Sequence, residues 1–237
     1  MPTPIDRLHE AQTWVFDLDN TLYPARCELF AQIDVKMMDF IARRFDIDPA
    51  AARVLQKELW QRHGTTLRGL MLDHGMEPGP FLDHVHDIDL APVSSCAVLK
   101  AAIEMLPGRK LVFTNGTVAH AERVLDKLDL GHCFEGVYDI VAMDYLPKPD
   151  PAAYARFCAR HDVDPTRAVM VEDLARNLVP AAALGMTTAW IAGANPWGLD
   201  DGVDHIHHVV EDLSIWLDGV VGPLRAVPAG AAAVRPD

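Results

Sequence analysis

The sequence contains few cysteines and no run of basic residues. The cysteines are widely spaced and form no CxxC pair, so we expect reduced thiols in a cytoplasmic protein; they are Cys27, Cys96, Cys133 and Cys158. The formal net charge is -13, which argues against a nucleic-acid polymer or an anionic membrane as a partner. A small phosphorylated substrate stays possible, because a bound metal ion can invert the local field.

Long hydrophobic runs are also missing. No uninterrupted apolar stretch is long enough to span a bilayer, and residues 1–6 lack the basic and apolar regions of a signal peptide. We therefore expect a cytoplasmic protein with no membrane partner. Half of the 237 residues are apolar, which suffices for one large domain or for a core domain with a small insert. We find no internal repeat.

Helical patterns fill residues 22–90. Apolar residues recur at helical spacing, Asp48-Pro49 resembles an N-cap followed by a first-turn proline, and Gly64 and Gly75 mark helix ends. The expected helices span residues 27–45, 48–63 and 65–75, with a short fourth piece after Pro80. The pattern predicts a compact helical insert.

After residue 90 strand-like and helix-like segments alternate. This order predicts βαβ units and a parallel sheet, and hence an α/β fold. The expected strands are residues 13–16, 110–114, 137–141, 168–171, 187–191 and 205–210. We expect a core domain of residues 1–21 and 91–221, a cap domain of residues 22–90, and a disordered tail at residues 222–237, which are rich in Ala, Pro and Gly.

The first strand ends in two carboxylates, Asp17 and Asp19. Spaced two residues apart, they leave the strand tip in the same direction. Open α/β sheets bind ligands at such tips, and burying two acids is costly unless a cation or hydrogen bonds compensate. An acidic turn is the alternative interpretation.

Two further strand tips carry groups suited to phosphate. Thr114, Asn115 and Gly116 precede a helix N-terminus and could cradle a phosphate, although a plain helix cap has the same sequence. Lys148 lies between two prolines, and such a stiffened loop could hold its cation against a phosphate or a carboxylate cluster. A surface lysine in a proline-rich turn is the alternative.

The fourth tip again carries two acids, Glu172 and Asp173. Together with the first tip they offer oxygen ligands that suit Mg²⁺. Favourable charge at a helix N-terminus explains one of these acids well and two less well.

Taken together, these four motifs resemble the haloacid dehalogenase-like superfamily of phosphohydrolases. The resemblance covers nearly the whole chain to about residue 215, including the helical insert. It implies a Rossmann-like core with a parallel sheet, an inserted all-helical cap of the C1 type, and Mg²⁺ as the cofactor. The halide-releasing members lack the second acid of the first motif, so Asp19 favours phosphate transfer.

The resemblance also implies roles for the site residues. Asp17 would be the nucleophile, Asp19 the general acid and base, and Lys148 the cation that steadies both nucleophile and phosphate. Mg²⁺ would be held by Asp17, the backbone carbonyl of Asp19, Asp173 and, directly or through water, Glu172. Because the acid role needs a proton before attack, we expect a raised pKa for Asp19. One departure is Asn177, where many members carry a further acid.

A closer likeness is to the pyrimidine 5'-nucleotidase group of this superfamily. The segments that carry it are residues 19–24, 67–70, 74–75, 145–149 and 171–173. It implies a small phosphorylated substrate such as UMP or CMP. We expect a monomer or homodimer. Arg68 would recognise phosphate or base and Tyr23 would stack nearby, unless they are a solvated and a packing residue. Phosphoglycolate or sugar phosphate hydrolysis and phosphomutase activity are alternatives.

Two histidine clusters offer metal ligands by residue type alone. Residues 83–89 contain two histidines among acids, and we favour a polar hinge between cap and core. Residues 205–208 contain three histidines, and alternation on an edge strand explains them better.

Overall fold

A six-stranded parallel sheet forms the centre of the molecule. The computed structural model describes residues 4–193 and 202–225. The strand order is β3-β2-β1-β4-β5-β6, and every neighbouring pair is parallel. The strands are β1 (Thr13–Phe16), β2 (Arg109–Phe113), β3 (Gly136–Tyr138), β4 (Ala168–Glu172), β5 (Thr187–Ile191) and β6 (His208–Val210). The predicted α/β class with a parallel sheet is confirmed.

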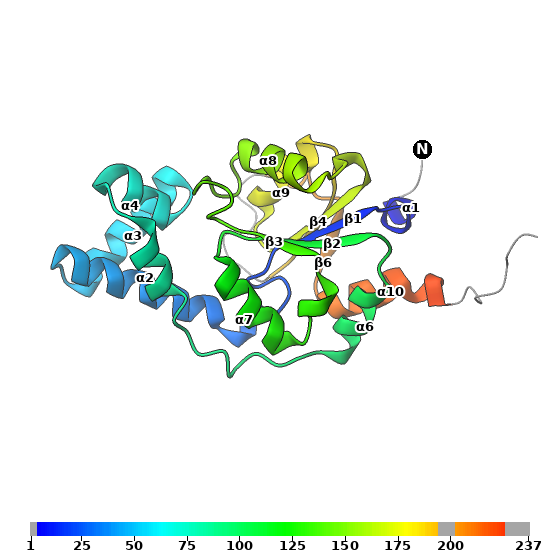
Figure 1. Cartoon of the computed structure of the whole chain (residues 1–237), viewed down its shortest axis with the longest axis horizontal. Coiled ribbons are helices and arrows are strands. Elements are labelled where there is room, and N and C mark those ends of the chain that lie inside the picture. The colour runs from blue at the N-terminus through cyan, green and yellow to red at the C-terminus, as the bar shows by residue number, and fades with distance from the viewer. Residues whose placement is uncertain (1–3, 194–201, 226–237) are drawn as a thin grey trace, which may run out of the picture.

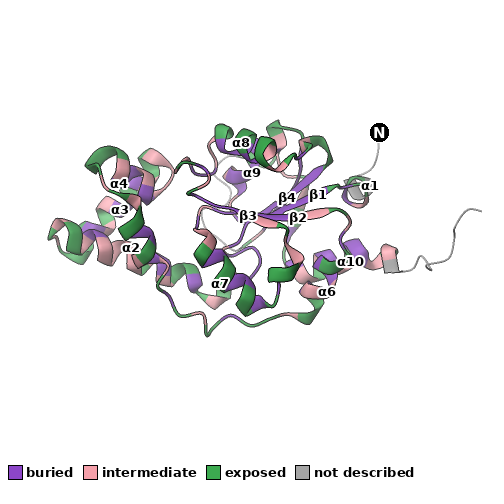
Figure 2. Cartoon of the chain, viewed as in Figure 1, coloured by how far each residue is buried: buried purple, intermediate pink, exposed green. Residues whose placement is uncertain are grey.

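Helices cover both faces of this sheet. In Figure 1, α8 (Pro151–His161) and α9 (Ala175–Ala183) lie above it, and α6 (Ala97–Met105), α7 (Val118–Leu128) and α10 (Leu213–Arg225) lie below. The short α1 (Pro4–His9) contacts α10 at the N-terminal side. Figure 2 shows the central strands buried between the helical layers, and every residue of β1, β4 and β5 is buried, as expected for strands covered on both faces. The edge strands β3 and β6 are partly exposed.

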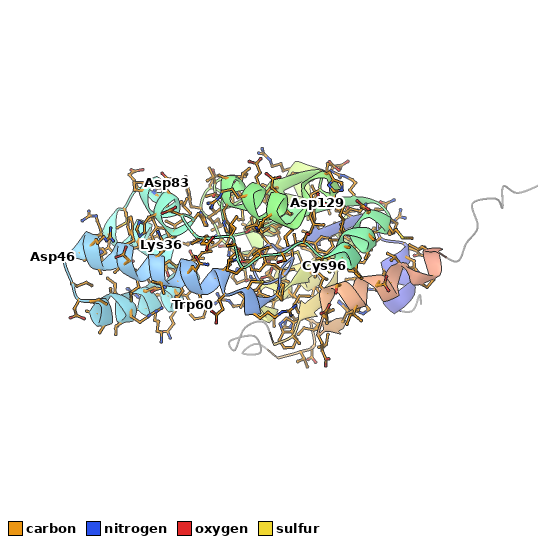
Figure 3. All side chains as sticks on the ribbon, turned by 90° about the horizontal axis from the view of Figure 1, so that it is seen from below. Lys36, Asp46, Trp60, Asp83, Cys96 and Asp129 are labelled. Carbon is orange, nitrogen blue, oxygen red and sulfur yellow. The ribbon has the colours of Figure 1, made fainter. Side chains whose placement is uncertain are left out.

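The insert after β1 forms a group of helices beside the sheet. Its helices are α2 (Leu29–Phe45), α3 (Pro49–His63), α4 (Thr66–His74) and α5 (Pro78–Val85), preceded by a 3₁₀ turn (Ala25–Cys27). Asp48 and Thr65 accept N-cap hydrogen bonds, and Gly64 and Gly75 end helices in the left-handed conformation. Figure 3 places Asp46 at the far end of this group. The helical cap expected from the periodicity is present.

The chain direction fixes where a ligand site can form. From β1 the chain passes to β2 and β3 on one side, and from β4 to β5 and β6 on the other. The carboxyl ends of β1 and β4 therefore meet at a topological switch point, where open parallel sheets bind ligands.

Some expected elements differ from those observed. The strand expected at residues 137–141 ends at Tyr138, because Asp139 turns the chain by accepting from the N–H groups of Val118 and Ala142. The strand expected at 205–210 is limited to His208–Val210. Two helices, α1 and α10, were not expected from the sequence, and α10 includes residues 222–225 of the expected tail. The remaining residues of that tail lie outside the described residues.

No described helix is long and apolar enough to cross a membrane.

Candidate active site

Asp17 and Lys148 meet at the carboxyl end of β1. The ladder with β4 continues to Asp17, whose N–H donates to the Val171 carbonyl oxygen over 2.9 Å. Lys148 Nζ donates to Asp17 Oδ1 over 2.7 Å and to the Phe113 carbonyl oxygen over 2.7 Å. The side chain of Lys148 is only 1% exposed. The lysine loop and the first strand tip, far apart in sequence, are thus in direct contact.

The acids after β4 complete this cluster. Glu172 Oε2 accepts from Lys148 Nζ over 2.9 Å, and its other oxygen accepts from Asn177 Nδ2. Asp173 Oδ2 lies 3.5 Å from Asn20 Nδ2. The carboxylates of Asp17, Glu172 and Asp173 lie close enough together to hold one metal ion. Asn177 thus supports Glu172 instead of adding a further carboxylate.

Burial and the neighbouring carboxylates disfavour the charged forms of Asp17 and Asp173. Burial, with the neighbouring Glu172, raises the pKa of Asp17 from 3.8 to about 7, although Lys148 opposes this shift. The pKa of Asp173 is also raised well above its ordinary value, first by burial and then by Glu172 and Asp17. The cluster thus holds three buried acids against one lysine, which is an arrangement that a divalent cation stabilises.

Asp19 has a different environment from Asp17. Its Oδ1 accepts from the Tyr23 hydroxyl over 2.7 Å and lies 2.9 Å from His120 Nε2. The raised pKa that we expected for Asp19 is wrong. Although burial raises it, the positive charge and hydrogen bond of His120 and the hydrogen bond of Tyr23 together lower the pKa of Asp19. Conversely, Asp19 raises the pKa of His120 against the effect of burial.

His120 was not predicted from the sequence. It lies in the first turn of α7, three residues after the N-cap Thr117, and so just beyond the motif that ends at Gly116. A polar residue one helical turn beyond a strand tip that carries site residues faces the site again, and this spacing could have identified it.

The residues that follow β2 hold their own backbone turn and the loop that carries Lys148. Thr114 Oγ1 accepts from the Gly116 N–H over 2.9 Å. The Asn115 side chain accepts from the Lys148 N–H and donates to the Lys148 carbonyl oxygen. A Cβ atom on Gly116 would lie 3.2 Å from the His120 ring and 3.6 Å from His86 Nε2. Asn115 therefore fixes the lysine loop, and the absence of a side chain at residue 116 leaves room beside the two histidines.

Arg68 and Tyr23, which were predicted to contact the substrate, lie in different environments. Arg68 lies in α4, half-buried, with Nη1 3.5 Å from Asp150 Oδ2 at the start of α8, so it bridges cap and core. Tyr23 is only 1% exposed and its hydroxyl contacts Asp19. In this conformation the buried Tyr23 ring contributes to holding Asp19, and its stacking on a base stays a prediction.

The two histidine clusters do not form metal sites in the described part of the chain. His84 lies 3.1 Å from Asp39 Oδ2, and His86 Nδ1 lies 3.2 Å from the Thr117 hydroxyl. His205 and His207 contact the Ala175 carbonyl oxygen and Thr188, respectively. Besides the Asp17 cluster, a second described group has spacing compatible with a metal ion. It consists of exposed Glu104 and His132 with half-buried Cys133.

Comparison with known families agrees with this geometry. The model of the haloacid dehalogenase-like hydrolases matches residues 12–185. That range runs from the start of β1 to the end of α9, and so includes all four strand tips and the helical insert.

Individual relatives are distant. Phosphate metabolism protein 8 of Saccharomyces cerevisiae is 22% identical over an alignment of 231 residues, and the match covers 89% of this chain and 65% of the yeast protein. The chain therefore spans just under two thirds of that relative's length. A phosphatase from Thermococcus onnurineus has a similar structure, with a TM-score of 0.59, 21% identity, and coverage of 89% of this chain and 98% of that one. An L-2-haloacid dehalogenase from Xanthobacter autotrophicus has a TM-score of 0.52 at 15% identity, covering 90% and 99%.

Proposed function

The chain belongs to the haloacid dehalogenase-like hydrolase family, and from this premise we propose that it is a Mg²⁺-dependent phosphomonoesterase. The observation that carries the proposal is the contact of buried Asp17 with Lys148, close to Glu172 and Asp173. Asp19 follows two residues after Asp17 in the chain. This arrangement supplies a nucleophile, a cation and an acid–base group at one strand tip.

The donor set fits a hard divalent cation. Asp17 and Asp173 carry carboxylates whose ionisation burial disfavours, and Mg²⁺ prefers a few carboxylate oxygens together with water. We propose that these two residues and the Asp19 carbonyl oxygen hold the ion, with Glu172 completing the cluster. When bound, Mg²⁺ supplies positive charge that offsets repulsion between the nucleophile and the phosphate dianion.

The reaction then follows from the residues of the chain. A carboxylate oxygen of Asp17 attacks phosphorus, and as this O–P bond forms the ester P–O bond breaks, giving an aspartyl-phosphate. Asp19 is ionised at rest because its pKa is lowered, so it first takes up a proton from water and then passes it to the leaving alkoxide. It later takes a proton from the water that hydrolyses the intermediate. Thr114 Oγ1 and the nearby backbone N–H groups bind the phosphate oxygens. Lys148 Nζ donates to Asp17, Glu172 and the Phe113 carbonyl oxygen, so it steadies the nucleophile and supplies positive charge beside the phosphate.

Asp19 separates phosphate transfer from halide release. A halide leaves without a proton, whereas an alkoxide needs one. Asp19 lies two residues beyond the nucleophile, and Tyr23 and His120 hold its carboxylate in place. A site whose reaction releases chloride does not need a proton donor. The presence of Asp19, and the hydrogen bonds that hold it, therefore favour phosphate esters over haloacids as substrates.

For the substrate we propose a pyrimidine 5'-mononucleotide. Support comes from the nucleotidase-like segments of the sequence and from Arg68, a half-buried cation where α4 of the cap meets the lysine loop. A guanidinium there suits a phosphate or a base carbonyl.

The substrate proposal is tested with a panel of phosphate esters. We expect UMP and CMP to give kcat/KM at least about tenfold above phosphoglycolate and sugar phosphates, because differential contacts of ~1.4 kcal/mol suffice for that ratio. The assay measures released phosphate, with Arg68→Met compared with wild type. A preference for sugar phosphates, or an Arg68→Met variant with unchanged KM for UMP, would contradict the assignment.

Metal addition gives a test that does not depend on turnover. Adding Mg²⁺ to metal-free protein should raise the Tm, because the ion binds the folded cluster and not the unfolded chain. At a hundredfold excess over Kd the gain is about 2.7 kcal/mol, or roughly 5–10 °C for a chain of this size. Differential scanning calorimetry of wild type and Asp173→Asn provides the comparison. A Tm rise of the same size in Asp173→Asn would place the ion elsewhere.

A further inference from the structure

The carboxylate of Asp19 is held from one side only. Among the described residues, both side-chain hydrogen bonds to it fall on Oδ1, from the Tyr23 hydroxyl and from His120 Nε2. A carboxylate can only accept, so Nε2 carries the hydrogen of the second contact. The two donors fix the carboxylate plane and leave Oδ2 as the oxygen available to a reacting group.

His120 is itself fixed by packing. Its side chain is fully buried, and its Nδ1 has no hydrogen-bond partner among the described residues. The ring lies face to face with the His86 ring, with centroids 4.5 Å apart and planes within 11°. The stack therefore determines the orientation of the His120 ring, because no second hydrogen bond does so.

His86 belongs to the segment that returns from the cap to the core. It follows α5 directly, and its Nδ1 lies 3.2 Å from the Thr117 hydroxyl at the start of α7. Arg123 of α7 donates to the carbonyl oxygens of His86 and Ile88, over 2.9 and 3.1 Å. The return segment is thus fastened to the helix that carries His120.

We propose that His120 is a positioning residue for the acid–base carboxylate of Asp19, and that His86 on the return segment of the cap holds the His120 ring in place. The proposal rests on the proposed phosphatase function. It goes beyond that function by assigning the orientation of the acid–base group to a histidine of α7 and, through it, to the path of the chain from cap to core.

The expected signature is a dependence on the leaving group. A misplaced Asp19 slows the departure of an alkoxide, which needs a proton, but hardly that of p-nitrophenolate, which leaves as an anion. kcat/KM reports the steps up to this departure. His120→Leu should therefore lower kcat/KM about 10²-fold for a nucleoside or glycerol phosphate and less than about tenfold for p-nitrophenyl phosphate.

Graded variants separate positioning from folding. His120→Gln keeps an N–H donor in the same region and should recover part of the alkyl-ester activity. His86→Phe keeps the stacked ring and should resemble wild type, whereas His86→Ala should show a weaker form of the His120→Leu defect. The matched control is His132→Leu, because His132 Nε2 also lies 2.9 Å from a carboxylate, Glu104, but on the surface. The His132→Leu variant should have the wild-type kcat/KM for both esters.

A measurement that does not depend on turnover separates the proposed contact between His120 and Asp19 from the proposed function. In ¹⁵N-histidine NMR spectra of the substrate-free protein we expect one ring N–H protected from exchange, and His120→Leu should remove it. If that signal is present but wild type hydrolyses no phosphate ester, the proposed function fails while the contact holds. If wild type turns over and His120→Leu affects both ester types equally, or neither, positioning by His120 is overturned.

Discussion

Asp17→Asn is expected to abolish phosphate release, by at least about 10⁴-fold in kcat, because the amide cannot form the acyl phosphate. The fold should survive. The variant replaces a carboxyl group, only 6% exposed, with a neutral side chain of equal size, and Lys148 keeps its contacts with Glu172 and the Phe113 carbonyl oxygen. Phosphate release and circular dichroism measure the two effects, and retained turnover would falsify the covalent route.

The same variant makes a prediction about pH. The raised pKa of Asp17 means that the folded protein binds this proton more tightly than the unfolded chain. The free energy of unfolding of metal-free wild type should therefore fall as the pH rises from 3.8 through about 7. Asp17→Asn removes this contribution, so its urea midpoint at pH 8 in EDTA should equal or exceed that of wild type. A much lower midpoint would show that the Lys148 contact outweighs the burial of the acid.

Lys148→Met is expected to give the largest loss of stability. Lys148 Nζ is the cation that contacts both Asp17 and Glu172, and all three side chains are buried. Removing one partner of a buried ionic cluster leaves uncompensated charge, at a cost of about 3–5 kcal/mol. The loss should be greater at pH 8 than at pH 6, because Asp17, with a pKa of about 7, is ionised at the higher pH. Turnover should also be lost.

Urea denaturation at both pH values measures this effect, and Lys36→Met is the matched control. Lys36 Nζ also lies 3.0 Å from an aspartate, Asp87, but that carboxylate is fully exposed. Solvent screens such pairs, so the control should unfold at nearly the wild-type urea concentration. Equal effects of the two substitutions would mean that the buried cluster contributes no more than a surface pair.

Most of the site residues that the sequence identified lie within a few residues of the strand tips. Parallel strands bring their carboxyl ends to one edge of the sheet, which explains why Asp17, Thr114 and Asp173 lie together. Lys148 reaches this edge from the loop between β3 and α8. The helical insert was also readable, because its capping residues and glycines are local signals.

The pKa of Asp19 could not be predicted from neighbouring residues in the sequence. The mechanism suggested a raised pKa, whereas the lowered value arises from His120, which lies 101 positions away in the sequence. The sequence left open whether Tyr23 stacks on a base or packs, and its burial against Asp19 depends on how the chain turns after β1. In both cases the environment of a side chain is set by contacts between elements.

The sequence by itself determined the α/β class, the cap and the four groups at the strand tips, because periodicity, capping and strand order act through neighbouring residues. Only the tertiary structure decided which nitrogen faces Asp19, that His86 stacks on His120, and that Asn115 and Asn177 support Lys148 and Glu172. These contacts join segments that are distant in the chain, and their energies depend on burial, which exists only once the layers have packed.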